Sequence, residues 1–353
     1  AKSQAEKRTF SHFVVPRFTR MRLPDAKGIQ DMYAGVVENE NRNELLVTDT
    51  LNLIQEGRTP ILLTERKEHA ALLASRLSDK VKNVFLLIGS DKQKEKREKM
   101  AALQNVPDDE DVVVVATGKY IGEGFDSPRL DTLLLAMPIS WKGTLAQYAG
   151  RLHRNYEGKH EVRIYDYVDI HVPTLERMYH KRLKGYAELG YQVKFGAADK
   201  SISTIYDGHA AMGSFEQDLI DAARSIVIVS PYLQKARIVK LLSLLQQAFD
   251  SGAGIVIHTK GSDNYDSQKQ ESVREAIAMI EQVGITVHAH KELQQRYAII
   301  DESIVWYGSV VFLAFGRKDT DVLRFENSDI AGELLAISEE ANGEQLMIED
   351  IPT

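Results

Sequence analysis

The chain of 353 residues contains no cysteine, only two tryptophans and no long uninterrupted apolar run. Without cysteine it can form neither disulfide bonds nor cysteine-ligated zinc sites, which agrees with a cytoplasmic location. A membrane-spanning helix needs ~20 consecutive apolar residues, and the polar start of the chain lacks the apolar core of a secretory signal. The sequence therefore predicts a cytoplasmic protein with no membrane partner and no metal site.

A basic excess is also absent, because the net charge is −7. The charge is unevenly distributed, however. Residues 1–30 carry seven Lys or Arg against two Asp or Glu, whereas residues 319–353 carry ten Asp or Glu against a single Arg. Nucleic acid binds to a local basic patch, so the negative net charge of the whole chain does not exclude DNA or RNA as a partner.

Two successive stretches of the chain alternate short apolar runs with helical patterns. Continuous runs such as Val112–Val115 are typical of strands buried on both faces of a parallel sheet. Alternation with helices predicts an α/β class, with a doubly wound parallel sheet followed by a second α/β domain. We predict a basic strand and linker over 1–42, a first domain over 43–195, a linker over 196–213, a second domain over 214–337 and a poorly ordered acidic tail over 338–353.

A glycine-rich segment, Ala116–Asp126, follows the strongest predicted strand. Its glycines at 118, 122 and 124 let the backbone approach another molecule, and their N–H groups suit phosphate oxygens. Asp126 is an acceptor suited to a ribose hydroxyl. Doubly wound sheets bind ligands at this edge. A plain glycine-rich turn between core elements is the alternative interpretation.

The segment Gln147–Arg154 has the pattern of a basic helix. Arg151 and Arg154 are three residues apart, so a helix would place both guanidinium groups on one face. Two such groups suit a triphosphate, whose transferred phosphoryl group they stabilise. The alternative is a solvated charged face.

The two segments, in this order and after strands, resemble the second motor lobe of superfamily 2 DNA and RNA helicases. Thr117–Asp126 resembles motif V, Gln147–Arg154 matches the Q-x-x-G-R-x-x-R pattern of motif VI, and Pro60–Glu65 resembles motif IV. The resemblance covers roughly residues 40–190 and implies a RecA-like fold. It assigns Arg154 to the γ-phosphate as the arginine finger, Arg151 to the same phosphate or the lobe interface, Gln147 to the nucleotide cleft, Gly124 and Asp126 to the nucleotide sugar, and Thr64, Thr117 and Gly118 to the nucleic-acid backbone.

The resemblance also implies ATP and Mg²⁺ as cofactors, but the chain shows no phosphate loop of the form G-x-x-x-x-G-K-S/T and no DEAD-type motif. The Mg²⁺ ligands are therefore expected outside this chain. The segment Phe10–Arg22 resembles the strand and linker that leave the first lobe. We expect a missing first lobe to be a partner, and the chain alone to hydrolyse no ATP.

The second domain contains Gln294–Val311, which resembles the phospholipase D-like nuclease motif H-x-K-x(4)-D-x(6)-G-S-x-N. Asp301 and Ser309 fit the pattern. Gln294 stands in place of the nucleophilic histidine and Arg296 in place of the lysine, and an amide cannot form the covalent intermediate. We predict an inactive phosphodiesterase fold that clamps DNA, forms a homodimer or docks another component.

Two histidine patterns in this domain have ordinary explanations. His258–Lys260 abuts Gly261–Asn264, which is too close to build a nuclease site. His288 and His290 share a strand face without an evident third ligand and are predicted to be packed or exposed. The leading function is an ATP-dependent helicase or translocase part, and the alternatives are a nuclease of a restriction or defence system and a non-catalytic binding scaffold.

Overall fold

The computed structural model describes residues 10–122, 125–139, 144–195, 202–203, 205–207, 211–315 and 320–349. These residues form two compact units that divide between Ile202 and Ser203. The first unit contains β1 (Ser11–Thr19), α2 (Ile29–Glu38), α3 (Glu40–Gln55), β2 (Pro60–Thr64), α4 (Lys67–Ser78), β3 (Asn83–Leu87), α5 (Gln93–Gln104), β4 (Val112–Thr117), α6 (Gly118–Gly122), β5 (Thr132–Leu135), α7 (Thr144–Leu152), β6 (Glu161–Asp169), α8 (Pro173–Leu189), β7 (Gln192–Lys194) and β8 (Ile202–Ser203).

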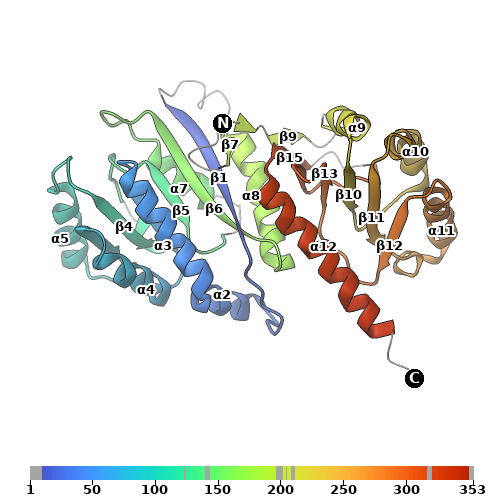
Figure 1. Ribbon diagram of the computed structural model, residues 1–353. Coiled ribbons are helices and arrows are strands. Elements are labelled where there is room, and N and C mark those ends of the chain that lie inside the picture. Colours follow the sequence, from blue (N-terminus) through green and yellow to red (C-terminus); the bar gives the residue numbers. More distant parts are fainter. Residues whose placement is uncertain are drawn as a thin grey trace. The chain divides into compact units, whose positions relative to one another are not determined.

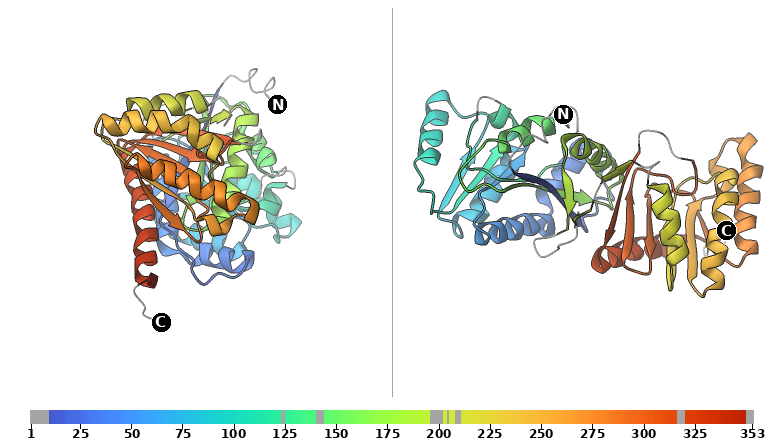
Figure 2. Two further views of the ribbon diagram at one scale, coloured as in Figure 1. Left: turned by 90° about the vertical axis from the view of Figure 1, so that its right-hand side faces the viewer. Right: turned by 90° about the horizontal axis from the view of Figure 1, so that it is seen from above.

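The first unit is built on a sheet with the strand order β3-β4-β2-β5-β6-β1-β7-β8, parallel from β3 through β7 (Figure 1). Helices α3 and α4 pack on one face, where they meet Tyr165 and Tyr167 of β6. The intervening Asp166 points to the opposite face and bonds Arg182 of α8. Because successive strand residues alternate faces, helices cover both sides of the sheet, as Figure 2 shows. The predicted doubly wound α/β class is confirmed.

The basic N-terminal segment differs from its prediction. Residues 1–42 were expected to form a strand and linker outside this domain, but β1 lies inside the sheet between β6 and β7. Its pairing runs from Ser11 opposite Glu161 to Thr19 opposite Asp169. The central residues Val14 and Val15 are almost fully buried. Strand β1 therefore belongs to the core of the first unit.

The second unit contains β9 (Ile205–Asp207), α9 (Met212–Asp221), β10 (Ser225–Val229), α10 (Lys235–Asp250), β11 (Gly254–Lys260), the 3-10 turn η1 (Ser262–Asn264), α11 (Ser267–Gln282), β12 (Thr286–His290), β13 (Tyr297–Ile300), β14 (Ile304–Gly308), β15 (Asp321–Glu326) and α12 (Ser328–Glu349). The sheet has the order β12-β11-β10-β13-β14-β15-β9. The pairs among β10, β11 and β12 are parallel, and the remaining pairs are antiparallel. This is a mixed α/β unit, as predicted.

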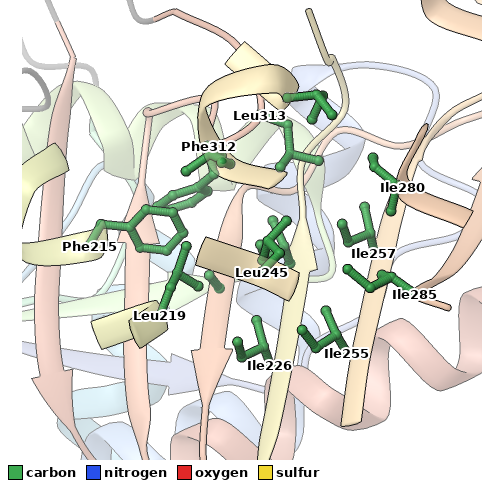
Figure 3. Close-up of a cluster of buried hydrophobic side chains, with 14 of the residues drawn as sticks. Phe215, Leu219, Ile226, Leu245, Ile255, Ile257, Ile280, Ile285, Phe312 and Leu313 are labelled. Carbon is green, nitrogen blue, oxygen red and sulfur yellow. The ribbon is translucent and has the colours of Figure 1, made fainter. Parts of the chain in front are cut away.

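One face of this second sheet carries the main apolar core. Phe215 and Leu219 of α9 pack with Leu245 of α10 over Ile226 and Ile255, as Figure 3 shows. Helix α12 lies on the other face, where the Tyr297 hydroxyl donates to the carbonyl of Leu334 at 2.9 Å.

The C-terminal segment differs from its prediction. The acidic tail from 338 was expected to be poorly ordered, yet helix α12 continues to Glu349. The first turns of this helix are anchored to the unit by Ala331 and Leu334, which are buried. No described helix combines the length and apolar character needed to cross a membrane.

Candidate nucleotide and nucleic-acid site

Three predicted motif segments meet at the carboxyl ends of neighbouring parallel strands in the first unit. Thr64 ends β2 and is in register with Thr117, which ends β4. Gly118 begins α6 immediately after β4, and Gly89 follows the neighbouring strand β3. Ligands of open parallel sheets bind at this edge because the loops and helix N-termini converge there.

Thr64 is fixed inside the protein rather than exposed to a ligand. Its side chain is 1% exposed, and its hydroxyl lies 3.2 Å from Nδ1 of His69. The other ring nitrogen of His69 lies 2.8 Å from Oδ1 of Asn43, whose amide nitrogen donates to Val37. Because Asn43 Oδ1 only accepts, Nε2 of His69 carries the proton and the Thr64 hydroxyl donates to Nδ1. Burial, as the largest cause, lowers the pKa of His69 to about 3, so the ring is neutral.

Thr117 orders the adjacent loop. Its buried hydroxyl accepts a hydrogen bond from the backbone N–H of Gly89 at 2.9 Å. The assignment of Thr64 and Thr117 to the nucleic-acid backbone stays a prediction, and both hydroxyls already have partners within the protein. A nucleic-acid contact here would therefore be made by the ends of β2 and β4, which these side chains hold in place.

Gly118 occupies a position where an added side chain would displace its neighbours. A Cβ atom there would lie 2.2 Å from both the Glu65 carboxylate and the Tyr148 hydroxyl. Those two groups bond each other, with Tyr148 donating to Glu65 at 3.1 Å. Burial and the neighbouring Glu65 carboxylate raise the pKa of Tyr148 well above its ordinary value. The glycine thus lets motifs IV, V and VI approach one another.

The predicted sugar-binding carboxylate and the predicted arginine finger are direct neighbours. Nε of Arg154 lies 3.2 Å from Oδ1 of Asp126, and both side chains are about half exposed. An exposed ion pair of this kind contributes little to stability because water screens it. Arg154 can therefore exchange this carboxylate for another anion at little cost.

The helical prediction for this segment is wrong at its end. Arg151 and Arg154 were expected on one helix face, but α7 ends at Leu152 and Arg154 lies in the following turn. Arg151 is half-buried and Gln147 is exposed. Gly124 lies outside the described residues, and the roles of Arg151 and Gln147 stay predictions.

Lys159 holds this turn in place, which the sequence pattern did not indicate. Its ammonium group donates to the carbonyls of Leu152 at 3.1 Å and Arg154 at 3.0 Å, and to those of Pro128 and Leu130 in the loop after Asp126. Burial lowers the pKa of Lys159 to about 8. One side chain thus ties the end of motif VI to the segment after motif V.

The second unit contains a separate cavity of about 1050 Å³ near the carboxyl ends of β10 and β11. Of the four residues predicted as a degenerate phospholipase D-like site, Arg296 and Ser309 line it. Asp301 instead caps a turn at the opposite end of β13, where its carboxylate accepts the backbone N–H groups of Ala223, Arg224 and Ser225. Gln294 is exposed and is not among the described lining residues.

Three histidines of the second unit, His258, His288 and His290, pack against each other. Nδ1 of His258 lies 3.0 Å from Nε2 of His290, and both rings are buried. The His288 ring lies beside His258, with ring centroids 5.1 Å apart and ring planes tilted by 32°. Burial lowers the pKa of His258 to about 3. No group of three or more potential metal ligands occurs within the part of the chain that the structure describes.

Comparison with known proteins supports a helicase-related chain. No protein-family model matches it. A stretch of 165 residues, 44% of the chain, is 33% identical to Putative helicase 161L of Invertebrate iridescent virus 6. A stretch of 90 residues is 37% identical to Uncharacterized protein 108L of Invertebrate iridescent virus 3 and covers 82% of that protein. The chain belongs to the family of protein 108L. It spans about a third of the length of the viral helicase that it matches, since the aligned part is 35% of that protein.

Solved structures are similar to parts of the chain at low identity. T4 UvsW shares 16% identity with a TM-score of 0.43, over 53% of this chain and 42% of UvsW. The phospholipase D family member Nuc from Salmonella typhimurium shares 15% identity with a TM-score of 0.34, over 40% of this chain and 92% of Nuc.

Proposed function

We propose that the first unit is the second motor lobe of an ATP-dependent superfamily 2 helicase or translocase. In this function Arg154 stabilises the γ-phosphate, and Asp126 binds the nucleotide sugar. A first lobe, in the same polypeptide or another, supplies the phosphate loop and the Mg²⁺ ligands. The observation that carries the proposal is the 3.2 Å contact between Arg154 and Asp126, which joins the two predicted nucleotide-binding groups.

The Arg154 guanidinium suits this role by its exposure and its attachment. The side chain is 56% exposed and makes only a solvent-screened pair, so a phosphate can compete for it. Its backbone is fixed, because Lys159 donates to its carbonyl. A planar guanidinium fork held at a fixed point binds phosphate oxygens in two parallel hydrogen bonds. Such a group stabilises the charge that develops during phosphoryl transfer.

The same edge of the sheet supplies the proposed nucleic-acid contacts. Thr64, Thr117 and Gly118 lie side by side where β2 and β4 end. We propose that this edge holds the DNA or RNA backbone, with the two threonine hydroxyls setting the loop positions. Contacts to the backbone carry no sequence information and weaken as salt rises.

ATP turnover tests the motor proposal. We expect no turnover by this chain alone, and nucleic-acid-stimulated turnover when a helicase first lobe precedes it. In that two-lobe protein, Arg154→Ala should lower kcat about 1000-fold, as removal of an arginine finger does. The control is Arg97→Ala, because Arg97 is an exposed arginine on α5. Full turnover by the Arg154→Ala protein would refute the assigned role.

We propose that the second unit is an accessory domain without phosphodiesterase activity. Among the described residues that line its cavity there is no histidine, so no imidazole is placed to attack phosphorus. Incubation of the chain with labelled DNA or RNA should leave the strand intact. Cleavage that is lost on substitution of Arg296 or Ser309 would instead favour the nuclease function.

A further inference from the structure

The cavity of the second unit is positively charged although the chain is acidic. Among the described residues that line it, the charged ones are Lys235, Lys269 and Arg296 against one carboxylate, Asp266. The first residues of α10 also line it, and the N-terminus of a helix of 16 residues favours an anion. In a chain of net charge −7, this local excess of cations indicates an anionic ligand.

Two of these cations have partners that a ligand can replace. Lys235 pairs with Glu275 at 2.6 Å, and Lys269 pairs with Asp266 at 3.6 Å. All four side chains are at least 42% exposed, so water screens both pairs. Phosphate oxygens can therefore take either ammonium group without leaving a buried carboxylate behind.

Exposed aromatic rings accompany the cations. Tyr232 and Phe315 both line the cavity, and they are 42% and 47% exposed. An ammonium group lies over one face of each ring, with Lys260 at 5.0 Å from the Tyr232 centroid and Lys240 at 4.9 Å from the Phe315 centroid. Exposed rings with adjacent cations form the pattern that binds single-stranded nucleic acid, since bases stack on rings while phosphates meet the cations.

Hydrogen bonds hold the segments carrying both rings. The Gln234 backbone N–H donates to the Leu313 carbonyl at 2.9 Å, and the Gln234 side chain accepts from the Phe315 N–H at 3.2 Å. The Tyr232 ring packs edge-on against Tyr265, with centroids 5.9 Å apart. Binding then requires little ordering of these segments, which favours affinity.

We infer that this cavity binds a segment of single-stranded nucleic acid without cutting it. Bases stack on Tyr232 and Phe315, and phosphates contact Lys235, Lys269 and Arg296. A duplex is excluded as the preferred ligand, because its base faces are already stacked. The site belongs to the second unit alone and does not depend on the motor proposal.

Fluorescence anisotropy with short labelled strands tests the aromatic part. The probes are oligo(dT), oligo(U) and a blunt DNA duplex, so that the first two distinguish DNA from RNA as the source. Tyr232→Leu and Phe315→Leu should each weaken binding of the preferred single strand by about 5- to 100-fold, the loss expected for one stacked base. The control Phe249→Leu removes a ring that is 37% exposed but lies outside the lining residues.

The salt dependence tests the cationic part. Lys269→Gln should make the slope of log K against log salt shallower by roughly 0.7, the value for one phosphate contact on a single strand. Arg274→Gln is the matched control, because Arg274 lies on the same helix, is exposed and is not a lining residue. Circular dichroism of each variant verifies that it is folded.

Photocrosslinking locates the strand on the chain. Bromodeoxyuridine or bromouridine in the preferred strand should crosslink to peptides that contain Tyr232 or Phe315, and it should still do so in Arg154→Ala. Crosslinks confined to residues 10–195, or equal affinity in Tyr232→Leu, Phe315→Leu and Phe249→Leu, would overturn the inference. Loss of ATP turnover in the two-lobe protein should leave these crosslinks unchanged. The motor proposal and the single-strand site can therefore be refuted independently.

Discussion

Replacement of Arg182 by methionine should destabilise the first unit strongly. Arg182 and Asp166 are each 1% exposed, and the guanidinium donates to both carboxylate oxygens at 2.7 and 2.8 Å. Its third bond, to the Ile139 carbonyl at 3.0 Å, holds the chain that leaves β5. Burial alone lowers the pKa of Arg182, but Asp166 outweighs burial and raises that pKa above its ordinary value.

The expected loss of stability follows from the Asp166 charge that the substitution leaves buried. Arg182→Met leaves the Tyr186 hydroxyl of α8, at 2.8 Å, donating to a buried Asp166 carboxylate that has lost its cation. Removing one partner of a buried ion pair costs roughly 3–5 kcal/mol. For a unit of this size, each 1 kcal/mol lowers Tm by about 2–4 °C, so Tm should fall by roughly 6–20 °C. The double variant Arg182→Met/Asp166→Leu removes both charges and should recover most of the loss.

The assay must report the first unit separately, because the chain has two. Denaturant-dependent hydrogen exchange, read on peptides from β6 and α8, gives its unfolding free energy. Arg274→Met is the control, since its pair with Glu271 is exposed on α11 of the second unit. The reasoning is refuted if Arg182→Met costs less than ~1 kcal/mol, or if the double variant is no more stable than the single one.

Three further predictions concern single side chains. Gly118→Ala should cost about 1–3 kcal/mol in chemical denaturation, because its Cβ would overlap two oxygen atoms at 2.2 Å, whereas Gly213→Ala meets no atom within 4 Å and should cost nothing. His69 has a pKa lowered to about 3 in the folded protein, so the unfolded chain binds more protons below pH ~6.5. The free energy of unfolding should therefore fall, as the pH drops below ~6.5, by up to ~1.4 kcal/mol per pH unit. His69→Gln should remove that part of the slope in urea titrations at several pH values. Asp301→Ala removes the acceptor of three backbone N–H groups and should lower Tm, at a cost of ~1–2 kcal/mol. Asp301→Asn should lower Tm less, because asparagine keeps one acceptor oxygen and tolerates the positive φ of 52°.

Local patterns predicted the elements well because their causes are local. The helix Pro173–Leu189 shows such local causes at both of its ends. Proline at the first helical position and a glycine in the left-handed conformation after Leu189 define the ends of the helix. The motif segments also lie at the predicted sheet edge, because each follows a strand that the sequence identifies.

Features that depend on distant pairing were not predicted. The place of β1 in the sheet depends on Ser11 meeting Glu161, a contact between residues far apart in the chain. Lys159 is an ordinary lysine in the sequence, and its four carbonyl partners become apparent only when the loop after Asp126 and the end of α7 are brought together. The cationic cavity similarly combines Lys235, Lys269 and Arg296 from separate elements.

In the first unit, the groups that hold the site in position differ from the groups that are proposed to act in it. The groups that hold the site are buried: the His69 ring is hydrogen-bonded between Thr64 and Asn43, and the Arg42 guanidinium lies 3.0 Å from Asp169. Arg154, by contrast, is 56% exposed and weakly paired. Substitution of a holding group should therefore lower the unfolding free energy and ATP turnover together. Arg154→Ala should lower turnover in the two-lobe protein about 1000-fold while leaving Tm unchanged, and a fall in Tm with that variant would show that Arg154 is a structural residue instead.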